Sequence, residues 1–267
     1  MKLIKELMNL RGRRALITGA NGGIGRHMST TIAELGGDLL LVDKPGTEYS
    51  ELLNILQSNF DINVICMDCD LEFENAREKL ISDILKLPKP LNILINNAAF
   101  AGTTDLPGWV SELKDQTIQT WKRALDVNLT TAFHLSRGLT PKLRLNKNGS
   151  IINVASIYGV LGPNYSLYEG TDMGNPAAYA VSKGGLIQLT RWLSTTLAPD
   201  IRVNTISPGG VFRNQADEFV HRYESRTPLG RMAREEDFIG VTAYLASDLS
   251  AYVTGQNLIV DGGWTAW

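Results

Sequence analysis

Three side chains in the second half of the chain have the chemistry of a proton-transfer site. Tyr179 and Lys183 are four positions apart, and Ser156 precedes them. On a helix, the phenol and the ammonium group lie on one face, one turn apart, although ordinary helix surfaces carry such pairs too. Because a neighbouring cation favours the phenolate, we expect the pKa of Tyr179 to lie below its usual value of about 10. Such a phenol can take a proton from an alcohol or give one to a carbonyl oxygen.

A glycine-rich turn near the start of the chain has the pattern of a dinucleotide site. The segment "ALITGANGGIG", from Ala15 to Gly25, joins an apolar run to a helical pattern. Small residues let the backbone approach a pyrophosphate, and the helix start offers free N–H groups to it. The next apolar run ends at Asp43, where a carboxylate can bind the adenosine ribose hydroxyls. Since that carboxylate would repel a 2′-phosphate, the sequence favours NAD over NADP.

Short apolar runs alternate with segments of helical spacing along the whole chain. The runs are nearly continuous in apolar residues, which is typical of strands covered on both faces. They lie at 14–18, 38–43, 62–67, 91–96, 150–156, 201–207 and 256–260, and helical spacing is found at 23–36, 73–86, 116–145, 176–198 and 234–247. This alternation predicts an α/β fold, in which a single Rossmann-type domain over residues 1–267 forms a doubly wound sheet of seven parallel strands with helices on both faces.

Taken in order, these motifs resemble the short-chain dehydrogenase/reductase family over roughly residues 10–263. The matching residues are Thr18, Gly19, Gly23, Gly25, Asn96, Asn97, Ala98, Ser156, Tyr179, Lys183, Pro208 and Gly209. The resemblance implies hydride transfer between NAD(P) and an alcohol or carbonyl carbon, with Asn128, Ser156, Tyr179 and Lys183 as the catalytic tetrad. The expected cofactor-binding residues are Gly19, Asn21, Gly22, Gly23, Ile24, Gly25, Asp43, Asp70, Leu71, Asn97, Ala98, Tyr179, Lys183, Pro208, Gly209 and Val211. Ala99 stands where the family usually has glycine, which leaves the local backbone conformation open.

Three segments that lack helical or strand patterns follow strand ends, on the side where such sheets bind ligands. They are 99–115, 157–175 and 208–232, and we expect them to form the substrate pocket. The number of residues between Ser156 and Tyr179 is about twice that usual in the family, so an insertion lies between them. Its aromatic residues argue against disorder. At its end, Asn175 is expected to cap the helix that follows.

Two stretches, "YEGT" and "SPGGVFRNQADEFVHRY", give a narrower resemblance to a bacterial branch associated with surface-glycan and nonulosonic-acid pathways. It implies a sugar, sugar phosphate or related polyol as substrate. Tyr168 and Glu169 are candidate partners for hydroxyl groups, and Arg213 is one for a phosphate or carboxylate. Two alternatives stay open. One is a 3-oxoacyl carrier-protein reductase, which would use NADPH, and the other is a regulatory protein that senses NAD without catalysis.

Composition and charge exclude several other classes. The net charge of −2 gives no global attraction to nucleic acid or an anionic membrane, and no apolar run is long enough for a spanning helix. Two cysteines and the lack of a signal-peptide pattern favour a reducing cytoplasm. Three scattered histidines show no metal-ligand spacing. We therefore expect a small-molecule substrate, no metal, no nucleic-acid or membrane partner, and, from the resemblance, a homotetramer or homodimer.

Overall fold

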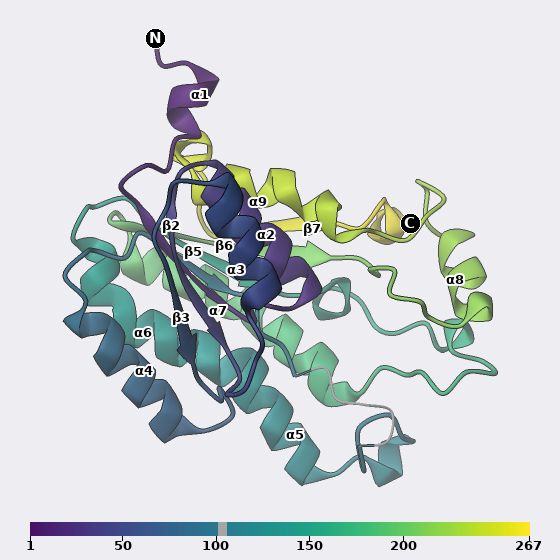
Figure 1. Ribbon diagram of the computed structural model, residues 1–267. Coiled ribbons are helices and arrows are strands. Elements are labelled where there is room, and N and C mark those ends of the chain that lie inside the picture. The colour runs from purple at the N-terminus through teal and green to yellow at the C-terminus, as the bar shows by residue number, and fades with distance from the viewer. Residues whose placement is uncertain (101–105) are drawn as a thin grey trace.

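The computed structural model describes residues 1–100 and 106–267, and its centre is a seven-stranded parallel sheet (Figure 1). The strands are β1 (Arg14–Thr18), β2 (Asp38–Asp43), β3 (Val64–Asp68), β4 (Ile93–Asn96), β5 (Gly149–Val154), β6 (Ile201–Pro208) and β7 (Asn257–Val260). They lie in the order β3-β2-β1-β4-β5-β6-β7, and every neighbouring pair is parallel. The predicted doubly wound sheet is confirmed, and the first two predicted strands match residue for residue.

Helices cover both faces of the sheet (Figure 1). They are α1 (Ile4–Leu7), α2 (Gly23–Glu34), α3 (Ser50–Asn59), α4 (Glu74–Lys86), α5 (Ile118–Leu125), α6 (Thr131–Arg144), α7 (Ala177–Leu197), α8 (Asp217–Glu224) and α9 (Ile239–Ala246). Residues of α2, α3 and α9 pack with inward-facing strand residues in one core, and residues of α4, α6 and α7 do so on the opposite face. The chain order reverses between β1 and β4, which opens a crevice at the carboxyl ends of these strands.

The structure corrects several predicted boundaries. The segment 116–145 is not one helix, because a π-helical turn at Asp126–Thr130 separates α5 from α6. The segment 208–232 contains α8, whose buried residues are only Phe219 and Tyr223, too few to produce a visible apolar pattern. The predicted loop 157–175, which includes the insertion, contains two short 3-10 turns, Ile157–Gly159 and Tyr165–Leu167. Within the predicted loop 99–115, residues 101–105 lie outside the described residues.

Residues 1–100 and 106–267 contain neither a candidate membrane span nor a candidate metal cluster. No helix there is long and apolar enough to cross a membrane. No group of three or more histidine, cysteine, aspartate or glutamate side chains in the same ranges lies close enough to hold a metal ion.

Candidate active site

A cavity of about 620 Å³ lies at the carboxyl ends of the central strands and collects most of the predicted site residues. Those that line it are Gly19, Gly22, Gly23, Ile24, Gly25, Asp43, Asn97, Ala98, Ser156, Tyr168, Tyr179, Lys183, Pro208, Gly209, Val211 and Arg213. Asn21, Asp70, Leu71, Asn128 and Glu169 are not among its lining residues. Side chains that are far apart in the sequence therefore meet in one hollow, as the parallel sheet requires.

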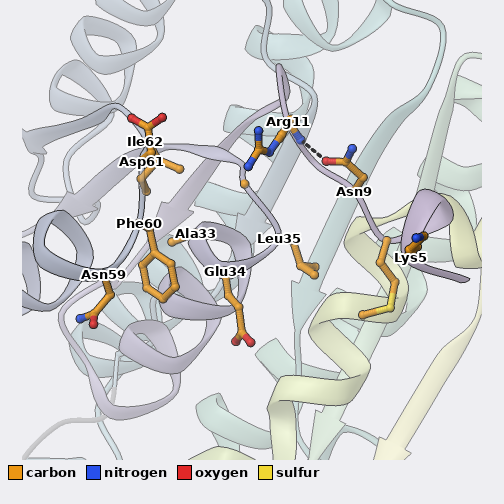
Figure 2. A pocket seen from close by; sticks show the side chains of 12 residues that line it. Lys5, Asn9, Arg11, Ala33, Glu34, Leu35, Asn59, Phe60, Asp61 and Ile62 are labelled. Atoms are coloured by element: carbon orange, nitrogen blue, oxygen red, sulfur yellow. Dashed lines mark hydrogen bonds between the residues drawn. The ribbon is translucent and has the colours of Figure 1, made fainter.

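A second hollow, of about 460 Å³, lies at the opposite edge of the sheet (Figure 2). It is formed by the chain before β1, the end of α2 and the segment between α3 and β3. Its charged side chains are Lys5, Arg11, Glu34 and Asp61, which carry both signs and include no predicted site residue. The chemistry predicted from the sequence is thus confined to the carboxyl edge.

The glycine turn forms a tightly packed backbone cradle. Gly19 has φ +62°, a conformation that glycine adopts at little cost. A Cβ on Gly25 would lie 2.1 Å from the carbonyl oxygen of Gly19, so no side chain fits there. Asn97 holds the turn from the neighbouring strand, because its Nδ2 donates to the carbonyl oxygens of Thr18 (3.0 Å) and Gly19 (2.9 Å). The turn leads into α2, which begins without a side-chain cap, so its first N–H groups suit a pyrophosphate.

Asp43 ends β2 beside this cradle and lines the cavity. Its Oδ2 accepts the N–H of Asn21 at 3.0 Å, and its Oδ1 accepts the N–H of Lys44 at 2.9 Å. Two backbone donors therefore fix the carboxylate. The nearby cation of Arg26 is engaged with Glu51 and with the carbonyl oxygen of Asn21. The position has the fixed negative charge that the sequence predicts for ribose recognition.

Ser156, Tyr179 and Lys183 all line this cavity. Lys183 is 2% exposed, and its Nζ donates to the carbonyl oxygen of Val154 at 2.8 Å. The same Nζ lies 5.7 Å from the centroid of the Tyr179 ring. Burial lowers the pKa of Lys183 to about 8. Ser156 follows β5, and its Oγ accepts the N–H of Tyr158 at 3.2 Å, which leaves its hydroxyl proton for the Tyr179 phenol.

The expectation of a lowered pKa for Tyr179 is wrong for the protein chain alone. Burial raises the pKa of this phenol, while a hydrogen bond from Ser156 and the positive charge of Arg213 act in the opposite direction. Lys183 is not one of the causes, because its ammonium group is directed to the Val154 carbonyl. Desolvation of the phenolate therefore outweighs the Ser156 hydrogen bond and the charge of Arg213.

Asn128 sits beside the cavity in the π-helical turn, with 2% of its surface exposed. Its Oδ1 accepts the N–H of Phe100 at 2.6 Å, and its Nδ2 donates to the Oγ of Ser182 at 2.9 Å. Both polar atoms are therefore engaged with protein. The side chain links the chain after β4 to α7 at the residue before Lys183.

Other predicted residues have partners outside the cavity. Asp70 Oδ1 accepts the N–H of Glu72 at 3.1 Å, and the carbonyl oxygen of Leu71 accepts the hydroxyl of Thr131 at 3.0 Å. Glu169 is exposed, and its carbonyl oxygen accepts from Arg222. Ala99 is not one of the residues with positive φ in the described chain, so a methyl group in place of glycine creates no backbone strain there.

Aromatic and polar side chains that were not among the predicted site residues complete the outer part of the cavity. Trp109, Tyr158, Asn175, Phe219 and Tyr223 all line it. The Tyr223 hydroxyl accepts the N–H of Gly210 at 2.6 Å, and the Tyr223 ring stacks on Trp264 with centroids 4.3 Å apart. This contact has no signature in the sequence, because Tyr223 lies on α8 whereas Gly210 follows β6.

The start of α7 also differs from the prediction. Asn175 does not cap this helix: the cap position is Pro176, which has no side-chain hydrogen bond. The N–H of Ala177 donates instead to Oε1 of Gln116 at 3.0 Å. The carboxamide of Asn175 is thereby left to face the cavity.

Comparisons with known proteins agree with this arrangement. A family model described as enoyl-(acyl carrier protein) reductase matches residues 19–265. The chain is 33% identical over 264 residues to a 3-oxoacyl-[acyl-carrier-protein] reductase from Rickettsia felis, covering 96% of this chain and 98% of that protein. It is 30% identical over 268 residues to an NADP-dependent mannitol dehydrogenase from Alternaria alternata, covering 98% and 95%.

A solved structure gives the same result. The crystal structure of a short-chain dehydrogenase from Leptospira borgpetersenii with bound NAD+ has a TM-score of 0.83 and 31% identity, over 99% of this chain and 96% of that one. With the fold, the glycine cradle and the Ser156, Tyr179 and Lys183 cluster all in place, the chain belongs to the short-chain dehydrogenase/reductase family of NAD(P)-linked oxidoreductases.

Proposed function

We propose that this protein transfers hydride between a nicotinamide cofactor and a secondary alcohol or ketone of a sugar, sugar phosphate or polyol. The observation that carries the proposal is the meeting of Ser156, Tyr179 and Lys183 with the glycine cradle in one cavity. When bound there, a nicotinamide supplies the carbon that gives or accepts the hydride. The protein's own groups then have to hold the substrate oxygen and move its proton.

The proton-transfer roles follow from the contacts of each group. The Ser156 hydroxyl accepts from the Tyr158 N–H, so its proton is free to donate to the substrate oxygen or to the phenol. Tyr179 takes the alcohol proton during oxidation and returns it during reduction. The Val154 carbonyl accepts one N–H of the Lys183 ammonium group and holds the group in place. The remaining N–H donors can bind a ribose hydroxyl of the cofactor. Asn128 positions α7 through Ser182 and acts as a positioning residue.

For the cofactor, we propose NAD in preference to NADP. The fixed carboxylate of Asp43 supports this choice, because a ribose 2′-hydroxyl can donate to it and a 2′-phosphate would be repelled. The relatives include both an NADP-dependent enzyme and a structure with NAD+. The ratio of kcat/KM for the two cofactors tests the assignment. Asp43→Ser should move the ratio toward NADP, and a wild-type preference for NADP would contradict the proposal.

The substrate class rests on a polar group in the outer cavity. Tyr158, Tyr168 and Asn175 place hydrogen-bonding groups there, which suit the hydroxyl groups of a sugar or polyol. Arg213 lies at the cavity surface, paired with Glu235 at 3.1 Å and 55% exposed, where it can meet an anionic substituent. The similarity to the Alternaria mannitol dehydrogenase supports a polyol.

A second candidate is reduction of 3-oxoacyl thioesters, favoured by the similarity to the Rickettsia reductase. The deciding experiment is a panel of sugar alcohols, sugar phosphates and short 3-oxoacyl thioesters, assayed with both cofactors by the absorbance of the reduced nicotinamide. Turnover of hydroxylated substrates alone is the expected result. Turnover of thioesters alone would select the second candidate, and turnover of none with intact NAD binding would favour a sensing protein.

We propose further that the chain acts as one domain in the cytoplasm and assembles as a homotetramer or homodimer. All seven strands belong to a single hydrogen-bonded sheet. Val181 and Trp192 on α7 expose 49% and 54% of their surface, which leaves apolar area for a second copy. Both cysteines are free thiols. Light scattering at micromolar concentration tests the assembly, and a monomer would contradict it.

A further inference from the structure

The insertion between Ser156 and Tyr179 presents a connected polar group to the cavity. The hydroxyl oxygens of Tyr158 and Tyr168 are 2.5 Å apart, and both side chains line the cavity. Burial raises the pKa values of both phenols. A hydrogen bond from the Asn175 side chain opposes this rise, and an electrostatic interaction with Tyr179 adds to it. The pair is therefore close both to Asn175 and to the proposed proton-transfer phenol.

Asn175 holds a buried acceptor without a donor. Its side chain lines the cavity, and the residue is 8% exposed. Within residues 1–100 and 106–267, its Oδ1 has no hydrogen-bond partner. The usual use of an asparagine before a helix is absent, because Gln116 accepts the Ala177 N–H instead. A buried carbonyl oxygen of this kind is unfavourable until a donor reaches it.

The other walls of the outer cavity are apolar. Trp109 and Phe219 line it, and each is at least nine-tenths buried. Trp109 is held in place by an edge-to-face contact with Phe100, whose ring centroid is 5.0 Å away. A ligand that fits has an apolar C–H face for the aromatic rings and hydroxyl groups at its edge for the polar group.

We propose that Asn175, supported by the Tyr158–Tyr168 pair, is a specificity residue that accepts a hydrogen bond from a second hydroxyl group of the substrate, close to the carbon that is oxidised. The inference rests on the proposed function and adds the chemical feature that is recognised, a diol rather than an isolated alcohol. Asn175 comes four residues before Tyr179, so one short segment reads the second hydroxyl and moves the proton of the first. A substrate without the second hydroxyl leaves the Asn175 carbonyl without a donor, which disfavours it.

The test compares cyclohexane-1,2-diol with cyclohexanol as substrates of the wild type and of Asn175→Ala. The wild type should prefer the diol in kcat/KM. In the variant, the loss on the diol should exceed the loss on cyclohexanol by about 10- to 100-fold, the range expected for one buried hydrogen bond. An unchanged ratio in the variant would overturn the inference.

Asn164→Ala is the matched control in the same insertion. The Asn164 carboxamide accepts from the N–H (3.2 Å) and the hydroxyl (2.9 Å) of Ser166, and it does not line the cavity. This variant should keep the wild-type preference for the diol. A loss of preference as large as that of Asn175→Ala would assign the effect to the insertion's conformation and refute a direct contact.

Two further measurements separate the possible failures. Tyr168→Phe keeps the aromatic ring and removes one hydroxyl, so it should weaken the diol preference even if Asn175→Ala does not fold. Calorimetric titration of the NAD-loaded protein with the diol reads binding without turnover. Turnover of cyclohexanol with no preference for the diol overturns this inference alone. If neither substrate is turned over but Asn175→Ala weakens binding of the diol, the proposed reaction is overturned and the diol site at Asn175 is kept. If the diol does not bind at all, the diol site is overturned as well.

Discussion

The cofactor side and the substrate side of the cavity are built in different ways. The cofactor side is a backbone surface, in which Gly19 and Gly25 pack so closely that a Cβ on the second would lie 2.1 Å from a carbonyl oxygen of the first. The substrate side is made of side chains, among them Tyr158 and Asn175, carried by an insertion with little regular structure. Backbone packing admits few residue types, so it is visible in a sequence. A wall made of side chains admits many residue types. The reaction type is therefore easier to predict from a sequence than the substrate.

The largest effect is expected where the two sides meet, at Tyr179. Tyr179→Phe removes the proton-transfer group and keeps the ring, so kcat/KM should fall by about 10²- to 10⁴-fold. The dissociation constant for NAD, measured by fluorescence titration, should change little, because the glycine cradle is untouched. Activity within a fewfold of the wild type would show that another group moves the proton.

On the cofactor side, Gly25→Ala should destabilise the fold and weaken NAD binding. The added methyl group meets backbone atoms, which cannot turn away, and overpacking of this kind costs about 1–3 kcal/mol. Thermal unfolding with and without NAD measures both effects. Gly240→Ala is the control, because a Cβ there has no neighbour within 4 Å and the residue lies in helix α9. Equal stability of the two variants would contradict the close packing.

On the substrate side, Tyr223→Phe should have a smaller effect, which reaches the cofactor because the Tyr223 hydroxyl lies against Gly209 and Gly210. It removes the acceptor of the Gly210 N–H and keeps the ring on Trp264, so we expect a loss of about 1 kcal/mol in stability and a fewfold rise in KM for the cofactor. Denaturant unfolding and steady-state kinetics measure these changes. Tyr165→Phe, on a residue that is 65% exposed, should leave both values unchanged.

The last expected effect concerns stability alone, and it is a pH dependence that comes from Lys183. Burial lowers its pKa to about 8, from 10.5 in the unfolded chain, so between these values the unfolded state binds more protons than the folded one. The penalty of burying the cation is complete below pH 8 and decreases as the pH rises. The free energy of unfolding of the wild type, relative to Lys183→Met, should therefore increase from pH 8 to 9.5 in denaturant titrations. A decrease would contradict the sign.

Much of the fold was predictable, because strands buried on both faces leave continuous apolar runs. The runs at 14–18 and 38–43 match β1 and β2 without error. Helix α8 was not predicted, since only two of its residues are buried. The π-helical turn was not predicted either, and the side chain of its Asn128 bonds to Ser182, which is distant in the sequence. Elements that depend on partners remote in the chain leave no local pattern.

The same distinction applies to the site. The cluster of Ser156, Tyr179 and Lys183 was predictable from spacing and order, and the structure brings the three together. The direction of the Tyr179 pKa shift was not, because burial and the direction of the Lys183 ammonium group are three-dimensional properties. Asn175 was expected to cap α7. The structure shows that Gln116 accepts the Ala177 N–H instead, so the Asn175 side chain is not used as a cap.

The hydrogen bond from Ala177 to Gln116 also bears on protein engineering. Gln116 follows the segment that carries Trp109, and its partner opens the helix that carries Tyr179. An exchange of this segment between relatives, made to alter the range of alcohols accepted, would remove this hydrogen bond at the start of the catalytic helix unless the glutamine were kept. Chimeras designed without it should therefore lose rate together with selectivity.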